Sequence, residues 1–195
     1  MAAQPQPYPS FDEYLARERQ AETRSEYVNG QIVVMAGASK EHVLIVSNLV
    51  TELALQLRNR HCFAFGSDMR LYIPLNNRGR YPDVSVVCGQ AEFYPGEPQD
   101  TLLNPTLLIE VLSESTEAID RGVKFDEYRS LATLREYLLV AQDRNQVEHY
   151  VRQSDNQWLL TIYTEPHQAI LLPSINCQLT LAEIYAKLDL LRGQA

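Results

Sequence analysis

Two acidic residues inside apolar, strand-forming segments constrain this chain more than any other feature. Asp83 lies in residues 81–87, YPDVSVV, which predict a strand opened by a proline. Glu110 lies in residues 106–112, TLLIEVL, whose apolar residues fall on both faces and predict a central strand covered on both sides. An ionised carboxylate in such a place is costly unless it is paired, hydrogen-bonded or bound to a metal.

A helix predicted over residues 117–131 carries the groups that could meet these acids. Asp120, Lys124 and Tyr128 are spaced four residues apart and share one helix face. Two acids on adjacent strands, with a lysine from the next helix, would form a divalent-metal site with a cationic helper. A structural ion-pair network explains the residues equally well, because Asp120 and Lys124 are also an ordinary i, i+4 pair. Tyr128 is most simply a packing residue.

The chemistry that suits such a site is hydrolysis of a phosphodiester. Mg²⁺ or Mn²⁺ held by Asp83 and Glu110, with the backbone carbonyl of Val111 as a further ligand, would activate water. Lys124 would orient that water and neutralise developing charge. Other catalytic sets have little support, since the chain has no HExxH, glycine-rich phosphate loop or GxSxG motif.

Three accessory residues are candidates beside Asp83, Glu110 and Lys124, and Asp120 is the first of them. A helix is predicted from Ser39 to about residue 60, with a buried stripe of Val46, Leu49, Val50, Leu53 and Leu57. His42 lies at its N-terminus, either as a core-edge histidine hydrogen-bonded to backbone or over the site. Glu26 precedes the hairpin turn Asn29-Gly30 and is either a solvent-facing or paired strand residue, or a neighbour of the acidic site.

The remaining pattern predicts one domain over residues 1–195, with residues 1–9 flexible. Its class is α/β or α+β, with one central mixed sheet flanked by helices. Helices are expected over residues 10–22 and 181–191, strands over 26–28, 31–35, 62–65, 69–73, 136–140, 147–151 and 158–163, and an exposed loop over 92–104.

The net charge of −8 counts against a protein that coats nucleic acid with its whole surface. It does not exclude a nuclease, whose metal site is itself acidic. The candidate phosphate-contacting clusters are Arg58 with Arg60, and Arg70 with Arg78 and Arg80, although solvated surface is the simpler interpretation.

Residues 1–7 resemble no signal peptide, and no apolar run is long enough to span a bilayer. We therefore expect a cytoplasmic protein without a membrane partner. Cys62, Cys88 and Cys177 are odd in number and lack a CxxC pair, so reduced, buried thiols are predicted and a zinc site is not.

Several segments, in order, resemble the Uma-type family, bacterial restriction-endonuclease-like proteins with a PD-(D/E)XK nuclease fold. The resemblance covers about residues 10–165 and is specific. It rests on YPDVSVV at 81–87, IEVLS at 109–113 with Ser115-Thr116, the residues Asp120, Lys124 and Tyr128, and REYL at 135–138. The earlier Glu26…Asn29-Gly30…Met35 and His42…Asn48-Leu49 also fit.

This resemblance implies that Asp83 fills the PD aspartate and Glu110 the (D/E) position. Leu112 stands where the orthodox motif places its lysine, and Lys124 then looks like the migrated lysine. The expected activity is that of a Mg²⁺- or Mn²⁺-dependent endonuclease acting on nucleic acid, in particular DNA. The alternative is a non-catalytic binding or assembly module that retains the fold, and a homodimer is a candidate assembly.

Overall fold

The computed structural model describes residues 8–193 and shows a mixed α/β fold, as predicted. The expected flexibility of residues 1–9 concerns mainly residues 1–7, which lie outside the described part. The elements are α1 (Phe11–Glu18), β1 (Ser25–Val28), β2 (Gln31–Val34), α2 (Lys40–Leu57), β3 (Cys62–Gly66), β4 (Arg70–Ile73), η1 (Pro74–Asn76), β5 (Arg78–Arg80), β6 (Val84–Cys88), β7 (Thr101–Leu102), β8 (Leu107–Leu112), α3 (Glu117–Ile119), the π-helical turn η2 (Asp120–Lys124), α4 (Phe125–Tyr128), β9 (Glu136–Ala141), β10 (Val147–Ser154), β11 (Gln157–Tyr163), β12 (Ala169–Leu172), β13 (Cys177–Thr180), α5 (Leu181–Ile184) and α6 (Leu188–Arg192).

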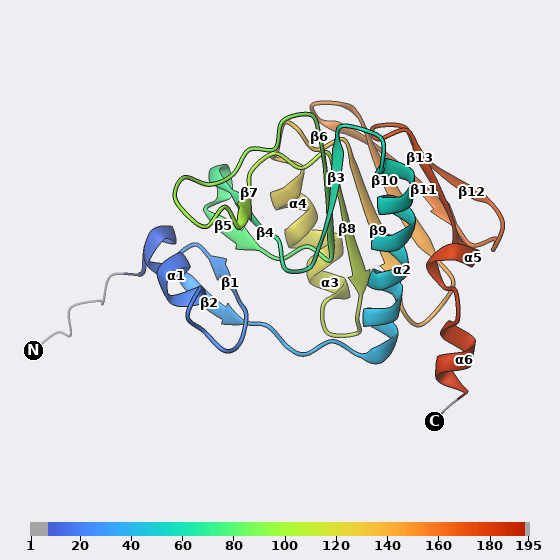
Figure 1. Ribbon diagram of the computed structural model, residues 1–195, viewed down its shortest axis with the longest axis horizontal. Helices are drawn as coiled ribbons and strands as arrows, with labels where there is room; N and C mark the ends of the chain where they lie inside the picture. Colours follow the sequence, from blue (N-terminus) through green and yellow to red (C-terminus); the bar gives the residue numbers. More distant parts are fainter. Residues whose placement is uncertain (1–7, 194–195) are drawn as a thin grey trace, which may run out of the picture.

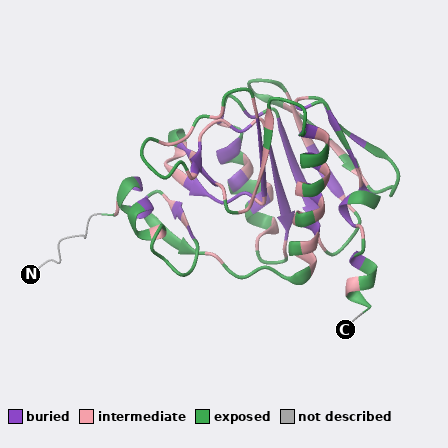
Figure 2. Cartoon of the chain, viewed as in Figure 1, coloured by how far each residue is buried: buried purple, intermediate pink, exposed green. Residues whose placement is uncertain are grey.

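A six-stranded sheet forms the centre of the molecule. Its order is β11-β10-β9-β8-β6-β3, with β8 and β9 parallel and the other neighbours antiparallel. All six residues of β8 are buried, which agrees with the prediction of a central strand covered on both faces (Figure 2). The long helix α2 lies on one face of this sheet, and the segment α3–η2–α4 lies on the other (Figure 1).

A second sheet of five strands, in the order β2-β1-β5-β4-β7, lies beside the first (Figure 1). Helix α1 packs on it through an aromatic cluster of Phe11, Tyr14 and Tyr27. The pair β12–β13 makes a third sheet. Three sheets therefore stand where the sequence indicated one, because the short strands β5, β7, β12 and β13 give no periodic signal of their own.

Three local expectations were wrong. The segment 92–104, expected to be an exposed loop, contains the buried strand β7, which pairs in parallel with β4. The expected helix over 181–191 is interrupted at Lys187, whose φ of 66° lies in the left-handed region. The buried stripe of α2 runs through Ile45, Leu49, Leu53 and Leu57, whereas Val46 and Val50 are only half-buried.

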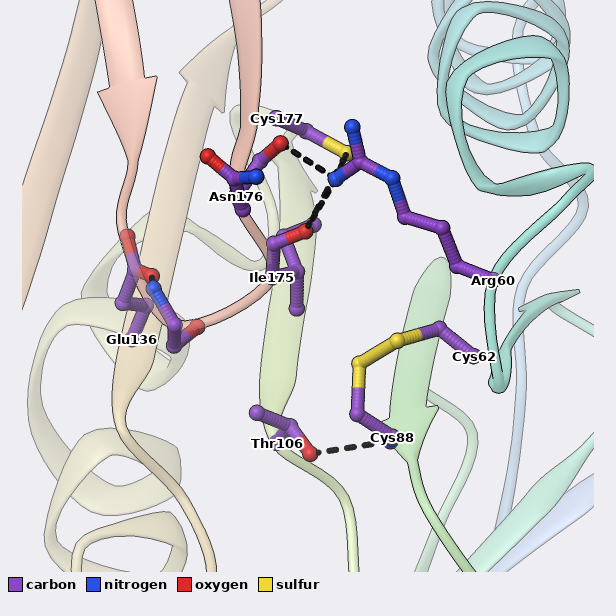
Figure 3. Close-up of a disulfide and its surroundings, with 9 residues drawn as sticks. Arg60, Cys62, Cys88, Thr106, Glu136, Ile175, Asn176 and Cys177 are labelled. Atoms are coloured by element: carbon purple, nitrogen blue, oxygen red, sulfur yellow. Dashed lines mark hydrogen bonds between the residues drawn. A yellow bond between two sulfur atoms is a disulfide. The ribbon is translucent and has the colours of Figure 1, made fainter.

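The expectation of three reduced thiols was also wrong, because Cys62 and Cys88 form a disulfide (Figure 3). The antiparallel register of β3 and β6 places these residues directly opposite each other, with Cα atoms 4.0 Å apart. Only Cys177 is a free, buried thiol in the described chain. The cysteines therefore give no support to the expected reducing, cytoplasmic environment.

Between residues 8 and 193, no helix combines the length and apolar content needed to cross a bilayer.

Candidate functional site

Asp83 and Glu110 meet where β6 and β8 pair. Val84 is the antiparallel partner of Ile109, so Asp83, which immediately precedes β6, comes opposite Glu110. The backbone N–H of Val111 donates a hydrogen bond to Asp83 Oδ2 at 2.7 Å. Asp83 therefore lies at the N-terminal end of β6, just before its first residue, and not within the strand. Its side chain is 13% exposed and that of Glu110 only 4%.

The segment α3–η2–α4 brings two donors to Glu110. Lys124 Nζ lies 3.1 Å from Glu110 Oε1, and the hydroxyl of Tyr128 donates to the same oxygen at 2.6 Å. The predicted contact between the helix-borne lysine and the strand carboxylate is therefore present. Tyr128 is buried, as expected of a packing residue, but it also bonds to the site.

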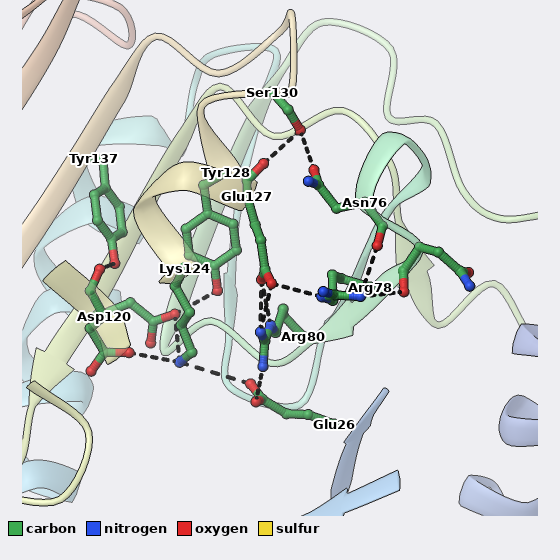
Figure 4. A network of polar contacts seen from close by, with 12 residues as sticks. Glu26, Asn76, Arg78, Arg80, Asp120, Lys124, Glu127, Tyr128, Ser130 and Tyr137 are labelled. Carbon is green, nitrogen blue, oxygen red and sulfur yellow. Dashed lines mark hydrogen bonds and ion pairs between the residues drawn. The ribbon is translucent and has the colours of Figure 1, made fainter. Parts of the chain in front are cut away.

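Three carboxylates surround the amine of Lys124 (Figure 4). Its Nζ atom lies 2.9 Å from Asp120 Oδ1, 3.1 Å from Glu110 Oε1 and 3.8 Å from Glu26 Oε1. Burial lowers the pKa of Lys124, but the charges of these three acids outweigh it and raise the pKa above its ordinary value. The group is therefore an ammonium at neutral pH and cannot accept a proton as a general base.

The surroundings of Glu110, unlike those of Lys124, favour the neutral form of the side chain. Burial raises the pKa of its carboxyl group to about 8, and the nearby charges of Asp120 and Asp83 add to this effect, whereas Lys124 opposes it. In the absence of a further cation, the Glu110 carboxyl therefore holds its proton at neutral pH. A divalent ion at this position would favour the ionised form and release that proton.

Arg78 and Arg80 are neither a phosphate-contacting cluster nor solvated surface. Arg80 is buried and binds Glu127 through Nε and Nη2, and Glu26 through Nη1 at 2.5 Å. Arg78 Nε binds the same Glu127 at 2.7 Å. Because alternate residues of β5 share a face, both guanidinium groups point toward α4 (Figure 4). Sequence reasoning missed this network, since Arg80 and Glu127 are far apart in the chain.

Of the other three arginines of those clusters, Arg70 and Arg60 bond to groups inside the protein, Arg70 also pairs with Asp100, and Arg58 is exposed. Arg70 is buried and bonds to Tyr81 and Thr101. Arg60 bonds to the carbonyl of Ile175 at the far end of α2 (Figure 3). Arg58 is exposed at the C-terminus of that helix. None of them pairs with Asp83, Glu110, Asp120, Glu26 or Glu127, the five acids that we call the acidic cluster.

His42 reaches the acidic cluster from the other side. Its Nε2 lies 3.2 Å from Asp83 Oδ2, and its backbone N–H bonds to Oγ of Ser39, the N-cap of α2. Burial lowers the pKa of His42, but the hydrogen bond and charge of Asp83, with the charge of Asp120, outweigh it and raise the pKa. Of the two interpretations, the position over the site agrees with the structure. Glu26 likewise lies beside the site and is paired.

The charges of this cluster leave room for a divalent cation. Its five acids are Asp83, Glu110, Asp120, Glu26 and Glu127, and its three cations are Lys124, Arg78 and Arg80. With Glu110 protonated and His42 not counted, one negative charge is left over, and it becomes two when a bound cation releases the proton of Glu110. Within the described chain, no donor bonds to Asp83 Oδ1 or Glu110 Oε2, so each carboxylate keeps one oxygen for a further ligand.

The oxygen ligands of this cluster suit Mg²⁺ or Mn²⁺ bound partly by water and substrate, and not a metal ion whose ligands all come from the protein. Among residues 8–193, no group of three or more His, Cys, Asp or Glu side chains is arranged to hold an ion alone. Mg²⁺ commonly takes one or two carboxylates and completes its shell with water and substrate phosphate. The residues present therefore fit an ion that is held partly by the substrate.

Comparisons with known proteins find a matching family and similar sequences. A family model named Uma2 and described as "Putative restriction endonuclease" matches residues 11–183. Two proteins of Synechocystis sp., both termed uncharacterized, are similar to the chain. One, sll1609, is 43% identical over 149 residues, which cover 76% of this chain and 84% of the relative. The other, slr1290, is 35% identical over 183 residues, which cover 92% and 93%.

A solved structure has the same fold. It is a crystal structure from Anabaena variabilis, described as a putative nuclease belonging to DUF820. It aligns with a TM-score of 0.68 and 21% sequence identity, covering 91% of this chain and 98% of that one. At this identity the likeness establishes the fold alone.

Proposed function

Because the chain belongs to the Uma2 family of restriction-endonuclease-like proteins, we propose that it is a metal-dependent nuclease that hydrolyses phosphodiester bonds of DNA. The observation that carries the proposal is the ammonium of Lys124, held 3.1 Å from the buried Glu110 inside a cluster with excess negative charge. A fold alone would not indicate this chemistry, because the same fold can serve binding as well as catalysis.

In this proposal Asp83, Glu110 and the backbone carbonyl of Val111 hold Mg²⁺ or Mn²⁺. When bound, the ion supplies charge neutralisation on the phosphoryl group and a more acidic water. The hydrogen bond from Val111 N–H fixes the orientation of Asp83, and Tyr128 fixes that of Glu110. These contacts keep the two carboxylates in place while their second oxygens remain available.

Lys124 acts as a charge rather than as a base. Its ammonium stabilises negative charge that develops on the phosphoryl oxygens, and Asp120, 2.9 Å away, positions it. His42, at the N-terminus of α2, faces Asp83 from the opposite side and is placed to contact a phosphate oxygen. The substrate phosphate would then lie beside Asp83 and Glu110, where His42 approaches from one side and Lys124 from the other.

A non-catalytic module is the alternative, and the arginine contacts argue against it. In a site that has lost its catalytic activity, an arginine would be expected to pair with the carboxylates at the positions of Asp83 and Glu110. Arg80, the buried arginine within the cluster, binds Glu26 and Glu127 and not Asp83 or Glu110. The two proposed ligands therefore stay open.

The test is a cleavage assay with single- and double-stranded DNA in Mg²⁺, Mn²⁺ or EDTA. We expect cleavage only with metal, and a loss of at least about 100-fold in Asp83→Ala and Lys124→Met. Asp126→Ala removes an exposed acid of α4 outside the cluster and is the matched control, expected to cut like the wild type. Metal-independent cleavage, or equal activity in Asp83→Ala, would contradict the assignment.

A further inference from the structure

The hairpin β1–β2 places an apolar strand beside the acidic cluster. In its register Glu26, which faces Lys124 and Arg80, pairs directly with Val33 of β2. Directly paired residues of an antiparallel hairpin share a face, so Val33 lies on the face that carries Glu26. Gln31 and Met35 are two residues away on either side and continue the same row. We call Gln31, Val33 and Met35 the hairpin row.

The strand β2 is unusually exposed for its composition. All four of its residues are exposed, including three β-branched apolar side chains, and Val33 and Val34 are 46% and 66% exposed. The aromatic cluster on α1 buries Tyr27 of β1 but leaves β2 uncovered. Val33 lies on one face of β2, and Ile32 and Val34 lie on the other, so both faces carry exposed apolar side chains. Exposed apolar surface in folded proteins commonly marks a binding surface.

The segment that runs from the hairpin turn through β2 to the start of α2 has no charged side chain. No Asp, Glu, Lys, Arg or His occurs between Val28 and Ser39, although the chain has 42 acidic or basic residues, 25 and 17 respectively. From β2 this stretch runs on to the N-terminus of α2, where His42 meets Asp83 (Figure 1). It therefore forms an uncharged rim along the cluster. The side chains of such a rim offer phosphates no cation, but they can contact the faces of nucleobases.

We propose that the hairpin row contacts the bases next to the scissile phosphate, and that the substrate is a single-stranded or locally unpaired nucleic acid. The inference rests on the proposed nuclease function. In an intact duplex the base faces are stacked and only the groove edges are open, so apolar side chains find contacts chiefly on unstacked bases. The acidic cluster holds the phosphate, through its metal, while the hairpin row holds the neighbouring bases.

The experiment compares Val33→Ser with Val34→Ser in the full chain. The kinetic constants kcat and KM are measured with Mn²⁺ on a single-stranded oligonucleotide and on its duplex. Val34 has the same chemistry and greater exposure but points to the opposite face, which makes it the matched control. Melting temperatures and their shift with Mn²⁺ show whether either variant disturbs the fold or the metal site.

We expect Val33→Ser to raise KM for the single strand about three- to tenfold with kcat unchanged, because a half-buried contact is lost. Val34→Ser should match the wild type, and Val33→Tyr, which offers a ring for stacking, should lower KM. Equal KM in Val33→Ser and wild type, equal effects of both serine variants, or a lower KM for the duplex overturns the inference and leaves the nuclease function standing. A wild type that cleaves neither form overturns both.

Discussion

Replacing Glu110 by glutamine is expected to change how the stability of the metal-free protein depends on pH. Burial, with the charges of Asp120 and Asp83, raises the pKa of Glu110 from 4.5 to about 8, against the influence of Lys124. Between these two pKa values the folded protein holds a proton that the unfolded chain has released. The free energy of unfolding therefore falls as the pH rises. This contribution is fully present below pH 4.5 and is lost as the pH rises through about 8.

The magnitude follows from the separation of the two pKa values. At about 1.4 kcal/mol per pH unit, the separation corresponds to at most about 5 kcal/mol. Glutamine keeps the shape of the side chain and an oxygen that can accept the hydrogen bond from Tyr128, but it does not titrate. Glu110→Gln should therefore exceed the wild type in stability by several kcal/mol at pH 9, with a difference that shrinks toward pH 5.

The assay is urea denaturation of both proteins in EDTA between pH 5 and 9. Subtracting the two curves removes the contribution of groups that titrate alike in both. Glu148→Gln is a control of opposite sign. Burial raises the pKa of Glu148, but its hydrogen bond and charge interaction with Arg121 outweigh burial and lower it. That stabilisation is present above pH 4.5 and lost as the pH falls through the lowered pKa, so Glu148→Gln should be less stable than wild type throughout.

Two parallel curves for the wild type and Glu110→Gln would refute the reasoning. Such a result would mean that Glu110 is ionised in the metal-free protein and that Lys124 fully compensates it. The acidic cluster would then be a balanced ion-pair network, with no deficit for a metal to fill.

Three further results are expected. Mn²⁺ at 100 times its dissociation constant should stabilise the protein by about 2.7 kcal/mol and raise its melting temperature, but not that of the Asp83→Ala, Glu110→Ala double variant; equal shifts would place the metal elsewhere. Asp83→Asn in EDTA should change the free energy of unfolding by no more than about 1 kcal/mol, because asparagine can still accept the hydrogen bond from Val111, and a loss of several kcal/mol in urea denaturation would sink the ligand assignment. Replacing both Cys62 and Cys88 by alanine should cost about 3 kcal/mol in the same measurement, since the disulfide closes a loop across a sequence separation of 26, and an unchanged midpoint would show that the bridge does not form.

Much of the local structure was predictable because its causes are local. Ser10 forms a capping box with Glu13, and Ser39 caps α2. Asn29 and Gly30 both adopt positive φ angles at the hairpin turn, as an Asn-Gly pair between two strand patterns predicts. The five apolar residues of β8 predicted a covered central strand, and Glu110 stood out among them. An acid buried among apolar residues needs a partner, and Lys124 on the following helix could be predicted as that partner.

Only the tertiary structure decided which distant groups meet at the acidic cluster. Glu26 could equally have faced water, and its place over Lys124 depends on β1 pairing with β5 in the second sheet. Arg80 finds Glu127 only because α4 packs over β5. The disulfide depends on the register of β3 against β6, which no spacing of cysteines encodes. Periodicity and caps report what each segment does alone, whereas ion pairs and bridges between segments depend on how the sheets are assembled, and that is settled by the packing of the whole chain.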